Sequence, residues 1–263
     1  MKIACIGTGA MGSAIMRSVC KKYDPKEITV TDAFADKAKE FSQENGCNFA
    51  SSNLDAIKDA KYIFIAVKPA FLKNLFDEIG SSISNDTVVI SMAAGVKIEK
   101  LESMAKARFI RIMPNVAAQI SEAMIALSCN DNISKEEQKE AVEILSAAGK
   151  VEKVPEKLMD CVTGVSGSGP AFVFMFIEAM ADAAVRCGMP RSQAYIYAAQ
   201  TVKGSAELVL ETGKHPGELK DSVTSPAGTT IEGVAALEEN GFRSAVIKAV
   251  TNATLKSIEL GKN

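Results

Sequence analysis

The chain has 263 residues, with 30 Lys and Arg against 32 Asp and Glu, and its formal net charge of −2 offers no basic surface for nucleic acid or an anionic membrane. One histidine and six cysteines without a Cys-x-x-Cys pair exclude a His-rich or zinc-finger metal site and predict reduced cysteines in an intracellular protein. Hydrophobic residues make up 47% of the chain, which is enough for a large core.

The first half of the chain alternates short β-rich segments with helical ones. Most of the β-rich segments are apolar and β-branched throughout, which is typical of strands buried on both faces of a parallel sheet. They cover residues 2–6, 28–32, 62–67, 87–91, 109–113 and 124–128. Helices are predicted over 11–22 and over 36–45, the second ending at Gly46. This alternation predicts a doubly wound α/β sheet.

A Gly-x-Gly-x-x-Gly motif joins the first predicted strand to the first predicted helix, and in that context it indicates dinucleotide binding. The first glycine permits a tight turn, the second lets the backbone approach a pyrophosphate, and the third allows close packing of helix and strand. The N–H groups and dipole of the helix start then favour the phosphates. The predicted cofactor contacts are Ile6, Gly7, Thr8, Gly9, Ala10, Met11 and Gly12.

Asp32 ends the second predicted strand, at the spacing of about 20 residues expected for the acid that binds the adenosine ribose. A carboxylate accepts hydrogen bonds from a ribose 2′-OH and repels a 2′-phosphate. No arginine follows it directly, and Lys37 and Lys39 lie further along the helix. The sequence therefore predicts that NADH is preferred, with NADPH as the alternative cofactor.

Small residues follow two further predicted strands at their C-terminal ends, where doubly wound sheets bind ligands. These small residues let a nucleotide pass close to the backbone. Lys68 is a charged residue at the end of one of the two strands, and a charge at a strand end beside the ligand site favours a contact with the ligand. The predicted contacts in these two segments are Ala66, Val67, Lys68, Pro69 and Ala94. Asn115, after the fifth strand, is a candidate for binding the nicotinamide amide, and the residues alone leave its role open.

From about residue 155 the pattern becomes purely helical. Helices are predicted from 170 to about 187 and over 192–212, 229–239 and 242–260. Apolar side chains lie on more than one side of them, as in the segment 172–177. Because so few helices cannot cover such faces by themselves, we expect a second copy of the chain to share their burial. The predicted domains are residues 1–155 and residues 156–263.

A small, polar loop precedes the third of these helices, in the sequence Ser225-Pro226-Ala227-Gly228-Thr229-Thr230. Thr229 and Glu232 stand three residues apart, which predicts a capping box. The N–H groups at this helix start, with hydroxyls nearby, suit a small carboxylate. An ordinary capped helix is the alternative interpretation.

Several motifs in this order resemble the signature of the pyrroline-5-carboxylate reductase family. They are AVKP at 66–69, AAG at 93–95, VTGVSGSGPA at 162–171, HPG at 215–217, LKD at 219–221, SPAGTTI at 225–231 and GFRS at 241–244. The resemblance implies reduction of L-Δ1-pyrroline-5-carboxylate to L-proline by NAD(P)H, the last step of proline biosynthesis. It implies an N-terminal Rossmann domain followed by an all-helical dimerisation domain. It also implies an active site that includes helices of the partner subunit, in a homodimer that some members assemble into decamers.

The resemblance also assigns the substrate contacts. Thr230 matches the family threonine whose hydroxyl hydrogen-bonds the ring nitrogen, and it is the predicted catalytic residue. Backbone groups of Thr229 and Thr230, with Ser225 nearby, match those that hold the substrate carboxylate. Glu156 matches an acid near the bound proline.

For the cofactor, the resemblance matches Asn53 to a family asparagine that contacts it. The family often has Asn-Arg or hydroxyl residues where this chain has Thr31-Asp32, a pattern that suits NADPH. This departure concerns the preferred cofactor and leaves the reaction unchanged.

Two other functions remain open on the residues alone. A β-hydroxyacid dehydrogenase-like enzyme needs a catalytic lysine in the first C-terminal helices, where Lys203 is the only candidate and matches no motif. The other function is that of a non-catalytic NAD-binding regulatory protein. It is disfavoured because the loop before Thr229 has no evident role in such a protein. The single histidine, His215, lies in a Lys-His-Pro-Gly loop, where a structural or surface role is favoured.

The sequence predicts a cytoplasmic protein. The first apolar segment is too short for a secretory signal peptide, since Gly7 interrupts it. The apolar stretch 170–177 is followed by Glu178 and Asp182 and is therefore too short to span a membrane.

Overall fold

The chain forms two compact units in the computed structural model, which describes residues 1–261. The first unit comprises Met1–Ser168 together with the segment from Asn252 onward, and the second comprises Gly169–Thr251. Residues 262 and 263, the end of the predicted helical domain, lie outside the described residues. The domain boundary after residue 155 stays a prediction.

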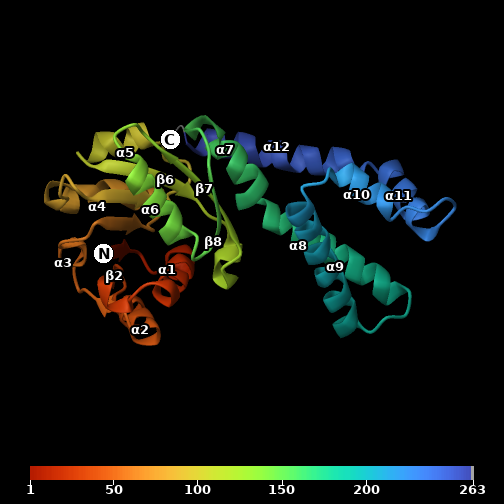
Figure 1. Cartoon of the computed structure of the whole chain (residues 1–263), viewed down its shortest axis with the longest axis horizontal. Coiled ribbons are helices and arrows are strands. Elements are labelled where there is room, and N and C mark those ends of the chain that lie inside the picture. Colours follow the sequence, from red (N-terminus) through yellow and green to blue (C-terminus); the bar gives the residue numbers. More distant parts are fainter. Residues whose placement is uncertain (262–263) are drawn as a thin grey trace. The chain divides into compact units, whose positions relative to one another are not determined.

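The first unit is built on one eight-stranded sheet in the order β3-β2-β1-β4-β5-β6-β7-β8 (Figure 1). The strands are β1 Ile3–Ile6, β2 Ile28–Thr31, β3 Asn48–Phe49, β4 Tyr62–Ile65, β5 Val88–Ser91, β6 Arg108–Met113, β7 Ala123–Cys129 and β8 Gly149–Lys153. Neighbours from β3 to β6 are parallel, β6 and β7 are antiparallel, and β7 and β8 are parallel. The predicted doubly wound sheet is thus confirmed, and β7 and the edge strand β8 run opposite to the other strands.

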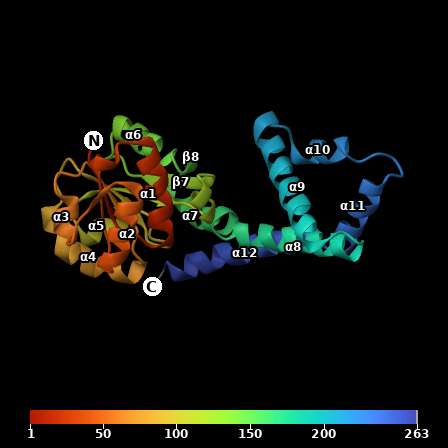
Figure 2. The same cartoon turned by 90° about the horizontal axis from the view of Figure 1, so that it is seen from below.

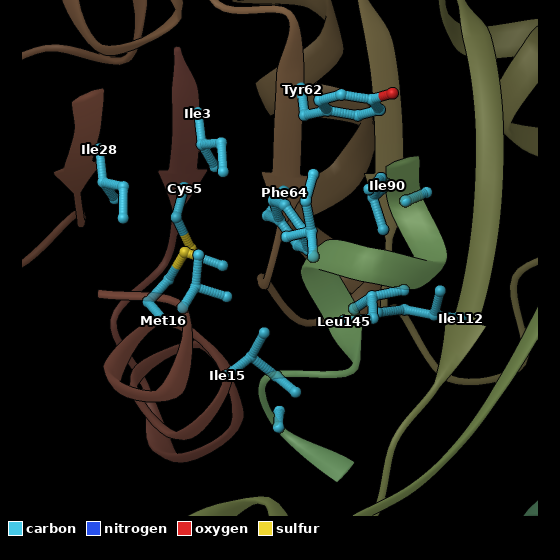
Figure 3. Packing of buried hydrophobic residues seen from close by; sticks show 14 of the residues in the cluster. Ile3, Cys5, Ile15, Met16, Ile28, Tyr62, Phe64, Ile90, Ile112 and Leu145 are labelled. Atoms are coloured by element: carbon cyan, nitrogen blue, oxygen red, sulfur yellow. The ribbon is translucent and has the colours of Figure 1, made fainter. Parts of the chain in front are cut away.

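Helices cover both faces of the sheet. They are α1 Ala10–Lys22, α2 Ala35–Asn45, α3 Asn53–Ile57, α4 Leu72–Ile79, α5 Ile98–Met104 and α6 Lys135–Leu145. One hydrophobic cluster joins α1, α2 and α6 to one face, and another joins α3, α4 and α5 to the other. Figure 3 shows the first cluster, with Met16 of α1 near Cys5 of β1 and Leu145 of α6 near Ile112 of β6. Since the side chains of successive strand residues point to opposite faces of the sheet, a wholly apolar strand contributes side chains to both clusters.

Short helical turns connect these elements. They are η1 Pro25–Glu27, η2 Pro69–Phe71, η3 Gly80–Ser82, η4 Val116–Ile120, η5 Glu156–Leu158 and α7 Met159–Val162. The segment η6, Thr163–Gly167, is a π-helix in which the Ser168 amide donates to the Thr163 carbonyl at 2.8 Å. The glycine- and serine-rich motif at 162–171 therefore widens one turn of a helical run that continues into the second unit.

The second unit consists of helices (Figure 2). They are α8 Gly169–Arg186, α9 Arg191–Thr212, α10 Pro216–Ser222, α11 Thr229–Glu239 and α12 Phe242–Leu260, whose last turns belong to the first unit. Four of them match the predicted helices, and α10 was not predicted. In that last part of α12, the Ser257 hydroxyl donates to Asp160 Oδ1 at 2.6 Å. Just after the helix, a β-carbon on Gly261 would lie 2.9 Å from the Gly95 carbonyl oxygen.

Large apolar side chains of the second unit remain exposed. Its cluster of buried hydrophobic residues, within the described part of the chain, is limited to Ala181, Ala194 and Ala198. By contrast, Phe174 is 61% and Met175 68% exposed. The helical run 156–186 is long and apolar enough to cross a membrane by length and composition alone, and only 6% of its apolar window is buried. Such a surface needs a cover supplied by another molecule.

A polar cluster attaches α6 to the sheet at Glu140. The Glu140 carboxylate accepts hydrogen bonds from the Lys61 ammonium at 2.5 Å and from the Tyr62 hydroxyl at 2.7 Å. The Lys61 ammonium, followed by the Tyr62 hydroxyl, lowers the pKa of Glu140. Because the folded pKa lies below the unfolded one, the cluster contributes stability above the unfolded pKa, and this contribution is lost as the pH falls through the folded pKa.

We therefore expect Glu140→Gln to lower the melting temperature by about 1–3 °C at pH 7, since the pair is partly exposed, and by less as the solution is acidified. Thermal unfolding from pH 7 down to about pH 3 measures this difference. Glu136→Gln is the control, because Glu136 is exposed on the same helix and forms no ion pair in the described chain. A difference that stays constant over this range would contradict the linkage.

Candidate functional site

The glycine motif forms the turn between β1 and α1. Gly7 has φ +105°, and a β-carbon there would lie 2.6 Å from the carbonyl oxygen of Ala66. A β-carbon on Gly12 would lie 2.1 Å from the Gly7 carbonyl oxygen. At Gly9, in contrast, nothing lies within 4 Å of a β-carbon. The fold itself therefore requires the first and third glycines, and the second leaves open space beside the helix start.

The start of α1 has the properties that a bound diphosphate needs. Gly9 is the N-cap residue, and it supplies no side-chain hydrogen bond to the first turn, which also contains no acidic residue. Ala10 is exposed and Met11 is half-buried at the first two helical positions. The free N–H groups, the positive end of a 13-residue helix and the open space at Gly9 fit the diphosphate of a dinucleotide.

Asp32 lies against the glycine motif. Its Oδ2 atom accepts hydrogen bonds from the Thr8 amide at 2.6 Å and from the Thr8 hydroxyl at 3.2 Å. Its Oδ1 atom accepts one from the Phe34 amide at 2.9 Å. The end of β2 is thus joined to the turn after β1, and these two predicted contact regions meet.

The end of β4 lies on the other side of the same turn. The Ala66 amide donates to the Ile6 carbonyl at 2.8 Å, which places Ala66 beside the glycine motif. The strand order reverses between β1 and β4, and this is where doubly wound sheets bind nucleotides. The Lys68 side chain is exposed, and its ammonium has no ion pair or hydrogen bond within residues 1–261, so its charge is available to a ligand.

Two predicted asparagines are engaged within the chain. The Asn53 side chain, in the first turn of α3, donates to Glu78 Oε2 at 2.9 Å. The Asn115 side-chain oxygen accepts from the Met124 amide at 3.3 Å, at the start of β7. Both have structural partners, and their contacts with a cofactor stay predictions, as does that of Ala94, which is exposed after β5.

Glu156 is held at the start of η5 by two donors. Its Oε1 atom accepts from Arg111 Nη1 at 3.0 Å and from the Ile98 amide at 2.8 Å. Arg111 lies in β6 and is only 4% exposed, so its charge is neutralised inside the sheet unit. Sequence reasoning missed Arg111, although an arginine inside the otherwise apolar predicted strand 109–113 was a signal that it needs a buried acidic partner. The proposed contact of Glu156 with substrate stays a prediction.

The loop before α11 differs from its prediction in one respect. Gly228 is the N-cap residue, and Thr229 is already the first helical residue, so the predicted capping box was wrong. The reason is a tight turn, in which the Gly228 amide donates to the Ser225 carbonyl at 3.1 Å and Ala227 has φ +55°. A β-carbon on Gly228 would meet the Ser225 hydroxyl at 2.3 Å, so a larger residue at the cap would require the Ser225 side chain to move.

This displaced cap leaves the start of α11 open to a ligand. No side chain caps its N–H groups. The hydroxyls of Ser225, Thr229 and Thr230 are exposed and form no hydrogen bond within the part of the chain that the structure describes. Free N–H groups next to free hydroxyls suit a small carboxylate, as the sequence predicts.

His215 has a structural partner, as expected for the structural or surface role that the sequence favours. Its Nδ1 atom accepts a hydrogen bond from the Gly217 amide at 3.0 Å and so caps α10. We expect His215→Ala to lower the free energy of unfolding by about 1 kcal/mol and His215→Asn, which restores a cap, to recover most of it. Urea denaturation measures both. A loss of turnover in both variants at unchanged stability would instead give the imidazole a catalytic role.

Family models match both parts of the chain. One described as pyrroline-5-carboxylate reductase dimerisation matches residues 156–260, and one described as NADP oxidoreductase coenzyme F420-dependent matches residues 2–95. Pyrroline-5-carboxylate reductase of Methanosarcina acetivorans is 46% identical over 99% of this chain and 98% of its own length.

Solved structures agree over nearly the full length. A pyrroline-5-carboxylate reductase from Coxiella burnetii has a TM-score of 0.92 at 32% identity and covers 98% of each chain. Pyrroline carboxylate reductase of Plasmodium falciparum, with NADP bound, has a TM-score of 0.87 at 30% identity, over 99% of this chain and 98% of its own. These likenesses extend across both units of the chain.

Proposed function

This chain belongs to the pyrroline-5-carboxylate reductase family, and on that premise we propose that it reduces L-Δ1-pyrroline-5-carboxylate to L-proline, the last step of proline biosynthesis. The observations that carry the proposal are the surroundings of two helix starts whose N-cap residues, Gly9 and Gly228, supply no side-chain hydrogen bond. The one at Gly9, with open space beside it, suits the diphosphate of a nicotinamide dinucleotide. The one at Thr229, with free hydroxyls, suits the carboxylate of a small imino acid.

The side chains then position the substrate. When bound, the reduced nicotinamide supplies the hydride that adds to the imine carbon C5. The N–H groups of Thr229 and Thr230, with the Ser225 hydroxyl, hold the substrate carboxylate and so fix the orientation of the ring. The Thr230 hydroxyl hydrogen-bonds the ring nitrogen. Because a threonine hydroxyl is a very weak acid, the imine enters already protonated, and this protonation also makes C5 more electrophilic.

The direct test is to incubate the purified full-length chain with NADH and pyrroline-5-carboxylate. We expect loss of reduced-nicotinamide absorbance with stoichiometric formation of L-proline. Oxidation of NADH with 3-oxoacids, and none with the cyclic imine, would favour the β-hydroxyacid dehydrogenase-like alternative. Binding of NADH without turnover of either substrate would favour a regulatory protein.

The preferred cofactor is proposed to be NADH. Asp32 supports this, because its carboxylate lies against the glycine motif and repels a 2′-phosphate. The Plasmodium falciparum relative has NADP bound, so the preference is a property proposed for this chain and not for the family. Steady-state kcat/KM with each cofactor is the measurement. Equal or higher efficiency with NADPH would contradict the preference and leave the reaction unaffected.

We also propose that the chain is a cytoplasmic homodimer formed through its helical part. The dimerisation family model covers this region, and the exposed apolar side chains of α8, α9, α11 and α12 provide the surface for a second copy. Light scattering after size exclusion should give twice the mass of the chain, or ten times if dimers assemble into a decamer. A protein extracted only with detergent would indicate instead that lipid covers the helical run 156–186.

A further inference from the structure

Thr8 carries a side chain that the glycine motif does not require, since the motif leaves this position free. The residue is only 7% exposed, and it directs both its amide and its hydroxyl at one atom, Asp32 Oδ2, at 2.6 and 3.2 Å. The Phe34 amide binds the other carboxylate oxygen at 2.9 Å. The carboxylate is therefore fixed at both oxygens, and only one of these three hydrogen bonds comes from a side chain.

We propose that Thr8 is a positioning residue that acts through Asp32 to set the preference between NADH and NADPH. The proposal rests on the proposed function, in which the carboxylate of Asp32 binds the adenosine ribose. The hydroxyl of Thr8 keeps that carboxylate in the plane fixed by the two amides, with its remaining lone pairs turned to the ligand. Asp32 then acts as an oriented hydrogen-bond acceptor and as a fixed negative charge.

These two effects act on the cofactors in opposite directions. An oriented acceptor favours the ribose 2′-OH of NADH, whereas a fixed charge disfavours the 2′-phosphate of NADPH. Without the hydroxyl, Oδ2 keeps a single hydrogen bond, and the carboxylate is freer to turn away from a 2′-phosphate. The segment that follows Asp32 also carries a positive charge. This is the Lys37 ammonium, which lies 5.0 Å from the centre of the Phe34 ring. The ratio of the two affinities is therefore the quantity that Thr8 controls.

The test compares Thr8→Val, which removes the hydroxyl at nearly constant shape, with Thr8→Ser, which retains it. Dissociation constants for NADH and NADPH are measured on the full-length chain by nicotinamide fluorescence, which has no tryptophan background here. We expect the Thr8→Val ratio of Kd for NADPH to Kd for NADH to fall about fivefold, and the Thr8→Ser ratio to stay within about twofold of the original. Thermal unfolding verifies that both variants are folded.

Two outcomes would overturn the inference. If Thr8→Val weakens both cofactors equally, Thr8 has only a structural role in the turn. If Thr8→Ser changes the ratio as much as Thr8→Val, the hydroxyl is not responsible.

The same pair of variants in an Asp32→Ala background tests the route of the effect. We expect Thr8→Val to change the ratio no further there, because its partner is gone. A change of the same size in that background would mean that Thr8 contacts the cofactor directly, and this too would overturn the inference. A starting chain that binds NADPH as tightly as NADH would contradict the proposed preference, yet the shift caused by Thr8→Val would still be measurable, so the two failures are distinguishable.

Discussion

Gly9→Ala is expected to remain folded and to lose most of its affinity for NADH. The open space at Gly9 accepts a methyl group in the protein alone, and its φ of −68° is ordinary for alanine. A bound diphosphate would occupy that space, and overpacking of about 1–3 kcal/mol corresponds to an affinity roughly 5- to 150-fold weaker. Alanine as the helix N-cap costs at most about 1 kcal/mol of stability. Nicotinamide fluorescence titration and thermal unfolding measure the two effects.

Gly12→Ala is the matched comparison within the same motif. Its β-carbon would lie 2.1 Å from the Gly7 carbonyl oxygen even without ligand, so this variant should lose stability as well as NADH binding. The contrast separates a glycine needed by the fold from one needed by the cofactor. An unchanged dissociation constant for NADH in Gly9→Ala would place the diphosphate elsewhere and remove the main support for the cofactor site.

Thr230→Ala is expected to lower kcat roughly 10- to 100-fold with no change in NADH affinity. A lost hydrogen bond to a charged group costs about 1.5–3 kcal/mol, and here the acceptor hydroxyl orients a protonated ring nitrogen. Because the Thr230 side chain is exposed and has no hydrogen bond in the described structure, its removal should change stability by less than about 0.5 kcal/mol. Steady-state kinetics with saturating NADH measures the loss.

Two further variants define which group acts. Thr230→Ser keeps the hydroxyl and should retain most of the turnover. Thr229→Ala removes the neighbouring hydroxyl but keeps both backbone N–H groups, so it should affect KM for the imine more than kcat. Unchanged turnover in Thr230→Ala, or an equal loss of turnover in Thr229→Ala, would refute the assignment.

The sequence allowed most of the fold to be predicted, because buried strands and capped helices have strong local signals. All six predicted strands are present, and α11 and α12 begin and end at their predicted residues. Strands β3 and β8 were missed for different reasons. Asn48–Phe49 is too short to show a pattern, and Gly149–Lys153 is polar because it lies at the edge of the sheet.

Non-local features could not be predicted in this way. The reversed direction of β7 depends on its pairing with β6, and its apolar sequence resembles that of the parallel strands. The capping box failed because the turn at Ala227 moved the cap to Gly228, one residue before the Thr–Glu pair.

In the candidate site, the local motifs were predictable, whereas the contacts between distant segments were not. The glycine motif and the distance to Asp32 are visible in the sequence. The hydrogen bonds of Glu156 to Arg111, and of Asp32 to Thr8, join residues far apart in the chain and become apparent only in the fold.

Helix α12 contributes the last part of the sheet unit to be synthesised. Its last turns belong to the sheet unit, where Ser257 bonds Asp160 and Gly261 lies against Gly95. The strands leave the ribosome first, yet their unit is complete only after the entire helical unit has been translated. A nascent chain that ends before α12 therefore lacks these contacts of the sheet unit. The last contacts of this unit can therefore form only after the whole helical unit has been made, although its sheet is made first.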